Sequence, residues 1–412
     1  MVFEPMSVSW RRFVCGALLL SCGSAAASWN APEPFRRDRV DGRDFDYNAE
    51  SFLHRFSFEP KPALGGHRGH QTDGLRGWAG STRSNELYVE MDAGMTIEFD
   101  APAFAAYQFR RREDFDGRYD ANLFGMGLFL GEFRFSVWGD VLGAKEDVDI
   151  HSELLWSPSA GNHVRFTLVS PDTWFNSKQG DGEYERQPYT YHVEGRWQAL
   201  DDLQLYGFIN HNNPVRLRED VQGFRFRDRQ DSAGLGFDLR LGPELALGVE
   251  VEGLYGTRRR DGLDEPEAAD QRQRRQFGLA TMELRQWLRD DLKAWYGLRY
   301  LHFDERNRQP RAEDGGEILE RRESLVYGGV RWRWREQITL APGVFVNYVD
   351  NTERYPGDPE QDDGDRGVYG KLTPAVEVLV DRRTGGTITF NPSVRLHRAA
   401  FGGGNIQVDL PF

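Results

Sequence analysis

Alternation of apolar and polar residues with a period of two is the feature that most limits how this chain can fold. From about residue 86 onward, segments of about 8 to 14 residues repeat this pattern. In residues 386–399, for example, Ile388, Phe390 and Val394 alternate with polar side chains. A β-strand with one apolar and one polar face has this period. The sequence therefore predicts an all-β protein.

The alternating segments predict strands that follow one another along nearly the whole chain. They cover residues 86–99, 103–113, 121–130, 132–142, 148–157, 162–170, 188–198, 202–211, 228–241, 244–257, 274–288, 291–304, 321–334, 337–349, 366–380, 386–399 and 405–412. Residues 44–58 alternate in the same way and are the candidate for one strand more. Residues 61–84, which are rich in glycine, read as a loop.

Two architectures are compatible with these strands, a soluble multi-sheet protein and a membrane-spanning barrel. Hydrophobic residues make up only 39% of the chain, and after the N-terminal region no apolar run approaches the roughly 18 to 20 residues of a spanning helix. Alternation alone does not decide between the two architectures, because a soluble sandwich alternates as well.

The connections between the segments favour a barrel, because tight turns alternate with long polar stretches. The tight turns are 157–162, 199–202, 242–244, 289–291, 335–336 and 383–386, and the long stretches are 171–188, 212–228, 259–273, 305–320 and 351–366. Short turns on one side of the membrane and long loops on the other are typical of outer-membrane barrels.

Aromatic residues near the strand ends, and the end of the chain itself, also favour a barrel. Trp and Tyr near strand ends suit the two membrane interfaces, and they include Trp156, Trp197, Tyr255, Trp287, Tyr300, Trp334 and Tyr348. The chain ends in an alternating segment with the apolar residues Ile406, Val408, Leu410 and Phe412. This ending resembles the C-terminal strand by which the barrel-assembly machinery recognises outer-membrane proteins.

Taken together, residues 86–412 resemble the bacterial outer-membrane β-barrel proteins of porin or export-channel type, although no specific family is identified. The resemblance implies a closed antiparallel transmembrane β-barrel over residues 44–412. Such barrels have an even number of strands, so we expect 18 strands with 44–58 included. The alternative is 16, if 86–113 is divided differently.

The N-terminus predicts export from the cytoplasm. Arg11 and Arg12 precede a short apolar stretch and small residues, and cleavage after Ala27 would remove residues 1–27 as a signal peptide. Lipoprotein processing at Cys22 is the alternative. Both cysteines of the chain, Cys15 and Cys22, lie in this signal, so the mature protein has no thiol for disulfides or thiolate chemistry. Residues 28–43 are then a polar periplasmic tail.

Arginines and carboxylates alternate on the face that the pattern assigns to the interior. An arginine on the lipid side at mid-membrane costs roughly 2 to 4 kcal/mol, so these residues should line a polar lumen. The candidate pore-lining residues are Arg240, Glu250, Glu252, Glu283, Arg285, Arg299, Arg331, Arg333, Arg335, Glu377 and Arg395. They indicate either a charged channel or a wall stiffened by ion pairs, and the sequence leaves both open.

The functional expectation is an outer-membrane channel that passes a hydrophilic solute, anionic or saccharide, in a Gram-negative bacterium after Sec-type export. The alternatives are a membrane-edge enzyme that modifies lipid or lipopolysaccharide, with His211 and Ser170 as the residues to check, and a structural barrel. We expect no catalytic residue, cofactor, metal site or nucleic-acid partner; the acidic loop 351–367 lacks the spacing of a calcium loop. The expected partners are outer-membrane lipids, lipopolysaccharide and the assembly machinery.

Overall fold

The structure, a computed structural model, describes residues 74–411 with gaps. The gaps are residues 84–85, 100, 115–116, 141–147, 160–161, 171–172, 174–181, 213–214, 220–223, 263–270, 309–315 and 397–399. The predicted signal peptide, the periplasmic tail and the predicted strand 44–58 lie outside the described residues, as does Phe412. Among the described residues, no helix is both long and apolar enough to cross a membrane.

The described chain consists of β-strands and one short 3-10 helix, η3 (Pro359–Gln361). The first ten strands are β1 (Gly74–Arg83), β2 (Glu86–Glu98), β3 (Ala103–Asp114), β4 (Gly117–Leu130), β5 (Phe133–Asp140), β6 (Ile150–Ser159), β7 (Asn162–Ser170), β8 (Gly182–Arg186), β9 (Thr190–Leu200) and β10 (Leu203–Asn212). The other ten are β11 (Val215–Glu219), β12 (Phe224–Gly242), β13 (Leu245–Gly262), β14 (Gln271–Arg289), β15 (Leu292–Arg308), β16 (Glu317–Arg335), β17 (Ile338–Arg354), β18 (Asp363–Asp381), β19 (Gly386–Arg395) and β20 (Ala400–Pro411).

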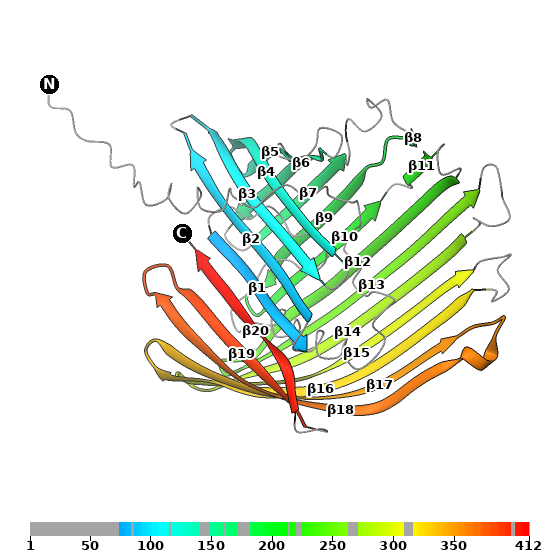
Figure 1. The fold of residues 1–412 in the computed structure, drawn as a ribbon. Coiled ribbons are helices and arrows are strands. Elements are labelled where there is room, and N and C mark those ends of the chain that lie inside the picture. Colours follow the sequence, from blue (N-terminus) through cyan, green and yellow to red (C-terminus); the bar gives the residue numbers. More distant parts are fainter. Residues whose placement is uncertain are drawn as a thin grey trace.

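All these strands belong to one 20-stranded antiparallel sheet (Figure 1). Neighbours in sequence are mostly neighbours in the sheet. β7 pairs with β9, and β10 pairs with β12, so the short strands β8 and β11 lie beside this path and pair with each other. β1 pairs with β2 on one side and with β20 on the other. The path of pairings therefore begins at β1 and returns to it.

Most strands lie where alternation predicted them, but three do not. β1 lies within the segment 61–84 that was expected to be a loop, and the five-residue strands β8 and β11 lie within the expected loops 171–188 and 212–228. The sequence of β1, GLRGWAGSTR, has too many glycines to alternate, so only its pairing with β2 and β20 identifies it as a strand.

Tight turns close one end of the strands, as predicted, and most of them are bonded to the strand beside them. The backbone N–H of Ser157 on β6 donates to the carbonyl of Glu132 in the β4–β5 turn, at 2.8 Å. Arg333 on β16 makes the same bond to Asp291 in the β14–β15 turn, also at 2.8 Å. Gly131, with φ of 63°, supplies the left-handed conformation that the β4–β5 turn needs.

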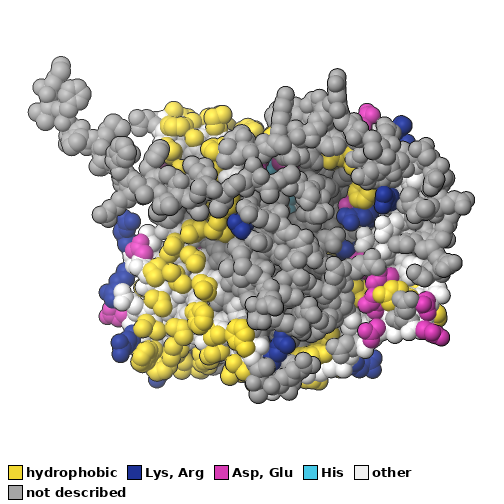
Figure 2. Space-filling view, in the orientation of Figure 1, with side chains coloured by type: hydrophobic (Ala, Val, Ile, Leu, Met, Phe, Trp, Pro, Cys, Tyr) yellow, Lys and Arg dark blue, Asp and Glu magenta, His cyan; other side chains and the backbone are white. Residues whose placement is uncertain are grey.

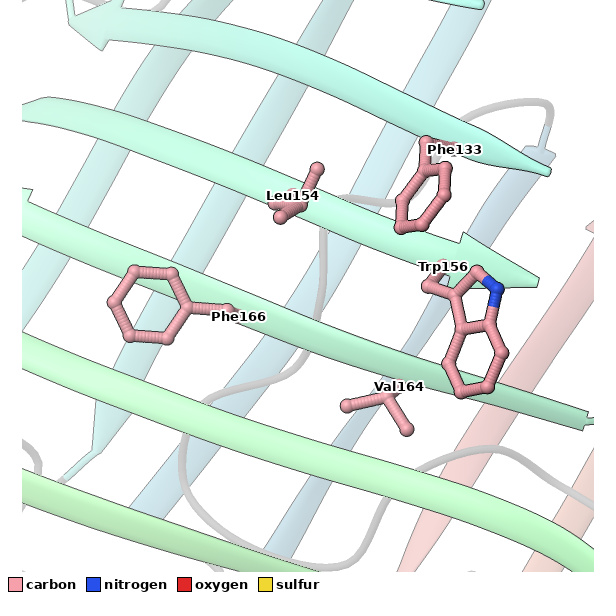
Figure 3. Close-up of a pocket in the computed structure, with 5 residues that line it drawn as sticks. All are labelled: Phe133, Leu154, Trp156, Val164 and Phe166. Atoms are coloured by element: carbon pink, nitrogen blue, oxygen red, sulfur yellow. The ribbon is translucent and has the colours of Figure 1, made fainter. Parts of the chain in front are cut away.

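One face of the sheet carries large apolar side chains that are exposed, and we call it the apolar face. Met126 is 74% exposed, Leu235 68% and Val326 56%. Figure 2 shows such side chains spread over the outside of the sheet, and Figure 3 shows five of them pointing the same way from β5, β6 and β7. The alternation of apolar and polar residues also predicts that this face carries Leu245, Val249, Leu284, Val376 and Leu396. Soluble monomers rarely expose an apolar surface of this extent.

Aromatic residues stand at the tight-turn edge of the apolar face. The indole N–H of Trp156 donates to Glu132 at 3.0 Å, and that of Trp332 donates to Asp291 at 3.2 Å. A ring in the apolar layer with its N–H bonded at the polar boundary is the arrangement expected at a membrane interface. Trp287 was expected there too, but that prediction was wrong: it shares a face with Glu283 and its ring contacts Lys293.

The opposite face, which we call the polar face, also contains apolar clusters that the sequence did not predict. Leu325, Tyr327 and Phe345 are 1%, 3% and 0% exposed and pack with Trp295. Similar clusters lie on β3–β5 and on β14–β16. Large side chains that pack across neighbouring strands therefore cover part of this face.

Candidate functional site

The polar face holds the charged residues that the sequence assigned to the interior. Glu250, Glu283 and Arg285 are only 1%, 3% and 7% exposed, and Arg299 is 6% exposed. On each of their strands the flanking residues belong to the apolar face. Burial of four ionisable side chains requires partners, because an isolated charge loses its hydration without compensation.

The other candidates on this face are less buried and lie farther along their strands. Glu252 is half-buried on β13, while Arg240 is exposed near the turn end of β12. Arg395 is half-buried on β19, where it stands opposite the buried Lys371 of β18. The candidates are therefore spread along the height of the sheet and do not converge on one point.

An ion-pair ladder crosses four adjacent strands, from β5 to β9. The first carboxylate is Glu153, which lies 3.1 Å from Arg134 and 3.6 Å from Arg165. Arg165 continues to Glu194 at 2.6 Å, and His192 lies 3.3 Å from the other oxygen of Glu194. Glu153 has no exposed side-chain surface and Glu194 only 4%. Each carboxylate thus contacts two basic side chains, an arrangement that offsets the cost of burial.

A second network joins β12, β14 and β16. The guanidinium of Arg285 forms an ion pair with Asp238 and lies 3.9 Å from Glu283. The hydroxyl of Tyr327 donates to the other oxygen of Glu283 at 3.1 Å. The aromatic cluster on β16 and the charges on β12 and β14 are therefore parts of one packed layer.

A third network lies nearer the long-loop end, on β15, β16 and β17. Glu323 accepts from Arg321 at 2.5 Å and from Asn347 at 2.8 Å, and it lies 3.9 Å from Arg299. On the neighbouring strands, Arg275 donates twice to one oxygen of Glu305, at 2.8 and 2.6 Å.

The pore-lining candidates Arg331, Arg333 and Arg335 occupy alternate positions at the end of β16, which would form a positive row if their charges were free. Arg331 forms an ion pair with Glu377 of β18, so its charge is largely compensated. Arg333 is exposed, and Arg335 lies beyond an irregularity in the pairing and stacks on the ring of Trp334 at 4.6 Å. The row is therefore not a uniform series of free charges, because period two fixes only the face and not the partner.

Several members of these networks were not among the candidates from sequence, including Glu153, Arg275, Glu305, Arg321 and Glu323. For Glu153, the neighbouring Leu154 and Leu155 blur the alternation in β6. His151 is buried two residues before Glu153 and therefore lies on the same face of β6, so it would have identified Glu153 as a polar-face residue. The pairing of particular charges depends on strand register, which the sequence does not state.

The residues considered for an enzyme do not come together. His211 bonds to Asp231 at 2.5 Å and packs on Tyr191. Ser170 lies on β7, and the register places β9 between its strand and that of His211, about 10 Å across the sheet. Among the described residues, no three His, Cys, Asp or Glu side chains gather closely enough to hold a metal ion.

Comparison with known proteins gives a likeness in fold. No protein-family model matches the chain, and no curated protein matches it. Among solved structures, it is similar to OmpT, an outer-membrane protein of Vibrio cholerae, with 12% identity and a TM-score of 0.36 over 82% of this chain and 98% of that one.

Two further structures are similar to the same degree. The outer-membrane channel DcaP of Acinetobacter baumannii has 8% identity and a TM-score of 0.37, over 82% of this chain and 96% of that one. OccK11 of Pseudomonas aeruginosa has 10% identity and a TM-score of 0.42, over 84% and 98%. Like the resemblance predicted from the sequence, these similar structures include bacterial outer-membrane proteins, and no specific family is identified.

Proposed function

We propose that the protein is a channel in the outer membrane of a Gram-negative bacterium, built as a closed transmembrane barrel of 18 strands. The proposal of a closed barrel is supported by the path of pairings that returns to β1, with β8 and β11 beside it. Closure leaves no edge strand with unsatisfied backbone groups, which a sheet in lipid requires.

The exposed apolar face is the single observation that carries the proposal. On β14, the apolar face carries Ala280, Met282, Leu284 and Leu288, with Gln286 between the last two, and the other face carries the charged Glu283 and Arg285. Eight residues of strand rise about 26 Å, or about 20 Å after a tilt of about 40°. That height approaches the roughly 25 Å apolar band of outer-membrane barrels.

The polar face then lines the lumen, and its mixed charges favour a hydrophilic solute. An 18-strand barrel is wide enough for an aqueous channel. We keep the expectation of an anionic or saccharide solute, since Arg333 and Arg335 stand exposed at the tight-turn mouth. A structural barrel is the second candidate, favoured by the burial of the ladder residues Glu153 and Glu194.

Conductance in a planar bilayer of uncharged lipid tests the proposal. We expect single-channel steps, and under a salt gradient a reversal potential that indicates anion preference. Changing Arg331, Arg333 and Arg335 together to Gln should reduce that preference, because a positive field at the mouth concentrates anions. The control removes three charges from other tight-turn residues, as Arg289→Gln, Arg382→Gln and Arg383→Gln. Inserted protein without conductance would favour the structural barrel.

Assembly and processing complete the proposal. We propose Sec-type export, removal of residues 1–27, and recognition of the C-terminal segment with Ile406, Val408, Leu410 and Phe412 by the barrel-assembly machinery. The pairing of β20 with β1 supports a late role for this strand, because it joins the two ends of the sheet. Phe412→Asp should lower outer-membrane levels; unchanged levels would contradict the assembly role.

A further inference from the structure

Five arginines stand side by side at the long-loop end of five adjacent strands, β11 to β15. Each arginine lies directly opposite the next one on the neighbouring strand. The cross-strand partners are Arg216 and Arg227, Arg227 and Arg259, Arg259 and Arg272, and Arg272 and Arg308. We call these five residues the arginine row. Adjacent strands are about 4.8 Å apart, so the row is about 19 Å wide.

The arginine row belongs to the apolar face of the sheet and not to the polar one. Cross-strand partners share a face of the sheet. Arg227 and Leu235 of β12 are an even number of residues apart and therefore lie on the same face, and Leu235 is 68% exposed. Arg308 and Tyr300 of β15 likewise lie on the same face, and Tyr300 is 47% exposed. The only irregularities in these pairings lie at the tight-turn end, beyond Arg240 and Trp287, so the face does not change between these positions. All five arginines are exposed.

Most of this charge is not compensated by the described part of the chain. Arg259 forms an ion pair with Asp261 of its own strand, at 2.6 Å. Within the described residues, Arg216, Arg227, Arg272 and Arg308 have no carboxylate within ion-pair distance. Like charges directly opposite each other on adjacent strands destabilise a sheet. An external polyanion would relieve that repulsion.

The exposed apolar residues of the apolar face form a band that we call the apolar belt, and the arginine row lies above it. The height of the row above the belt limits what the polyanion can be. Arg272 and Arg308 each lie eight residues beyond the outermost belt position of their strand, which is Ala280 or Tyr300. Arg227 lies six residues beyond Ala233, and Arg259 lies four residues beyond Tyr255. Four to eight residues of tilted strand rise about 10 to 20 Å. A phospholipid phosphate lies close to the edge of the hydrocarbon, whereas a saccharide headgroup with phosphates and acidic sugars extends to this level.

We propose that the arginine row binds the anionic saccharide headgroup of a glycolipid in the outer leaflet. The proposal rests on the transmembrane placement proposed above, but it does not depend on channel activity. Guanidinium groups suit the task because they bind phosphate and carboxylate oxygens in a bidentate manner. The outward direction of the row favours a ligand in the surrounding membrane over a solute in the lumen.

Binding to defined lipids tests the proposal with the full mature chain in detergent. The probes are lipopolysaccharide with a phosphorylated core, lipid A without a core, phosphatidylglycerol, and inorganic phosphate alone. The test variant combines Arg227→Gln, Arg272→Gln and Arg308→Gln. The control combines Arg289→Gln, Arg382→Gln and Arg383→Gln, which removes the same charge at the tight-turn end. Heat-modifiable migration on gels verifies that each variant is folded.

We expect the test variant to bind the phosphorylated-core lipid on the order of 100-fold more weakly than the control does. Its binding to lipid A and phosphatidylglycerol should match the control. Equal affinity of both variants for the core lipid would overturn the proposal, and so would equal losses for all three lipids. Competition by inorganic phosphate at similar concentration would indicate a simple ion site and would also overturn it.

A second variant keeps the test decisive if the triple Gln variant does not fold. Lys at the same three positions retains the charge and should retain most of the binding, while high salt should weaken binding of the unchanged protein. Binding that is insensitive to salt would contradict the proposal. Conductance in uncharged lipid is measured separately, so failure of the channel proposal and failure of lipid binding are distinguishable.

Discussion

Two regions of the sheet differ in strand length although they share the same apolar belt. Strands β5, β6, β7, β9 and β10 have 8 to 11 residues, whereas β12 to β18 have 17 to 19. About 9 to 11 residues are enough for a tilted strand to cross an outer membrane. The longer region therefore continues beyond the belt at the long-loop end.

The comparison separates what membrane crossing requires from what the extra length adds. In the short region the polar face carries the ladder of Arg134, Glu153, Arg165 and Glu194, and the other face is apolar almost throughout. In the long region the added residues on the outward face are mostly polar or charged and include the arginine row, while the opposite face also carries the apolar cluster with Phe277 and Phe303. We infer that the extension contacts water and headgroups, while the shared belt contacts lipid.

The largest expected effect distinguishes a fully buried carboxylate of the short region from a partly exposed one in the extension. Glu153→Gln removes the shared partner of Arg134 and Arg165, so we expect a loss of about 3 kcal/mol in unfolding free energy. Glu320→Gln removes a partly exposed partner of the exposed Arg354, 3.8 Å away, and should cost less than about 1 kcal/mol. Guanidinium unfolding of the protein in vesicles measures both, and equal costs would refute the contrast.

The next prediction locates the upper edge of the belt within one strand. Met282→Arg introduces a charge on the lipid side and should cost roughly 2 to 4 kcal/mol. Gln276→Arg lies on the same face of β14 in the extension, and we expect a change below about 1 kcal/mol. Folding equilibria in phospholipid vesicles test the pair. A large cost at both positions would place the extension inside the membrane and end the comparison.

The smallest expected effect concerns the edge where the two regions are alike. Trp156 in the short region and Trp332 in the long region each donate to a carboxylate of a neighbouring tight turn. Phe at either position keeps the ring but loses the hydrogen bond, so each variant should lose about 0.5 to 1 kcal/mol. Unfolding midpoints of the two variants give the answer, and clearly different losses would show that the regions already diverge at this edge.

Alternation in the sequence predicted the strands well wherever one face is apolar and the other polar. β7, at Asn162–Ser170, has the predicted bounds, and the tight turns lie where expected. The pattern does not identify β1, which is rich in glycine. Its predicted bounds for β12 to β18 stop three to five residues short at the long-loop end, where most side chains on both faces are polar and hydrophobicity no longer alternates. Strand pairing, not side-chain pattern, defines these parts.

The candidate site was predicted by face but not by partner. The polar face carries Glu250, Glu283, Arg285 and Arg299, as expected from the alternation of apolar and polar residues along their strands. Arg331 forms an ion pair with Glu377, two strands away. The sequence does not predict this pair, because it depends on the strand register and on the length of the arginine side chain. The inward cluster of Leu325, Tyr327 and Phe345 was missed because apolar residues occur on both faces there. Such residues carry no period-two signal.

Accessibility along one long strand tests the transmembrane barrel most directly. Single cysteines at each position from 276 to 288, in a mature chain without the cysteines of the signal region, would carry spin labels in vesicles. We predict that oxygen accessibility peaks at Met282 and Leu284, falls at Glu283 and Arg285, and gives way to aqueous accessibility toward Gln276. Peaks at Glu283 and Arg285, or no alternation along the strand, would contradict the account.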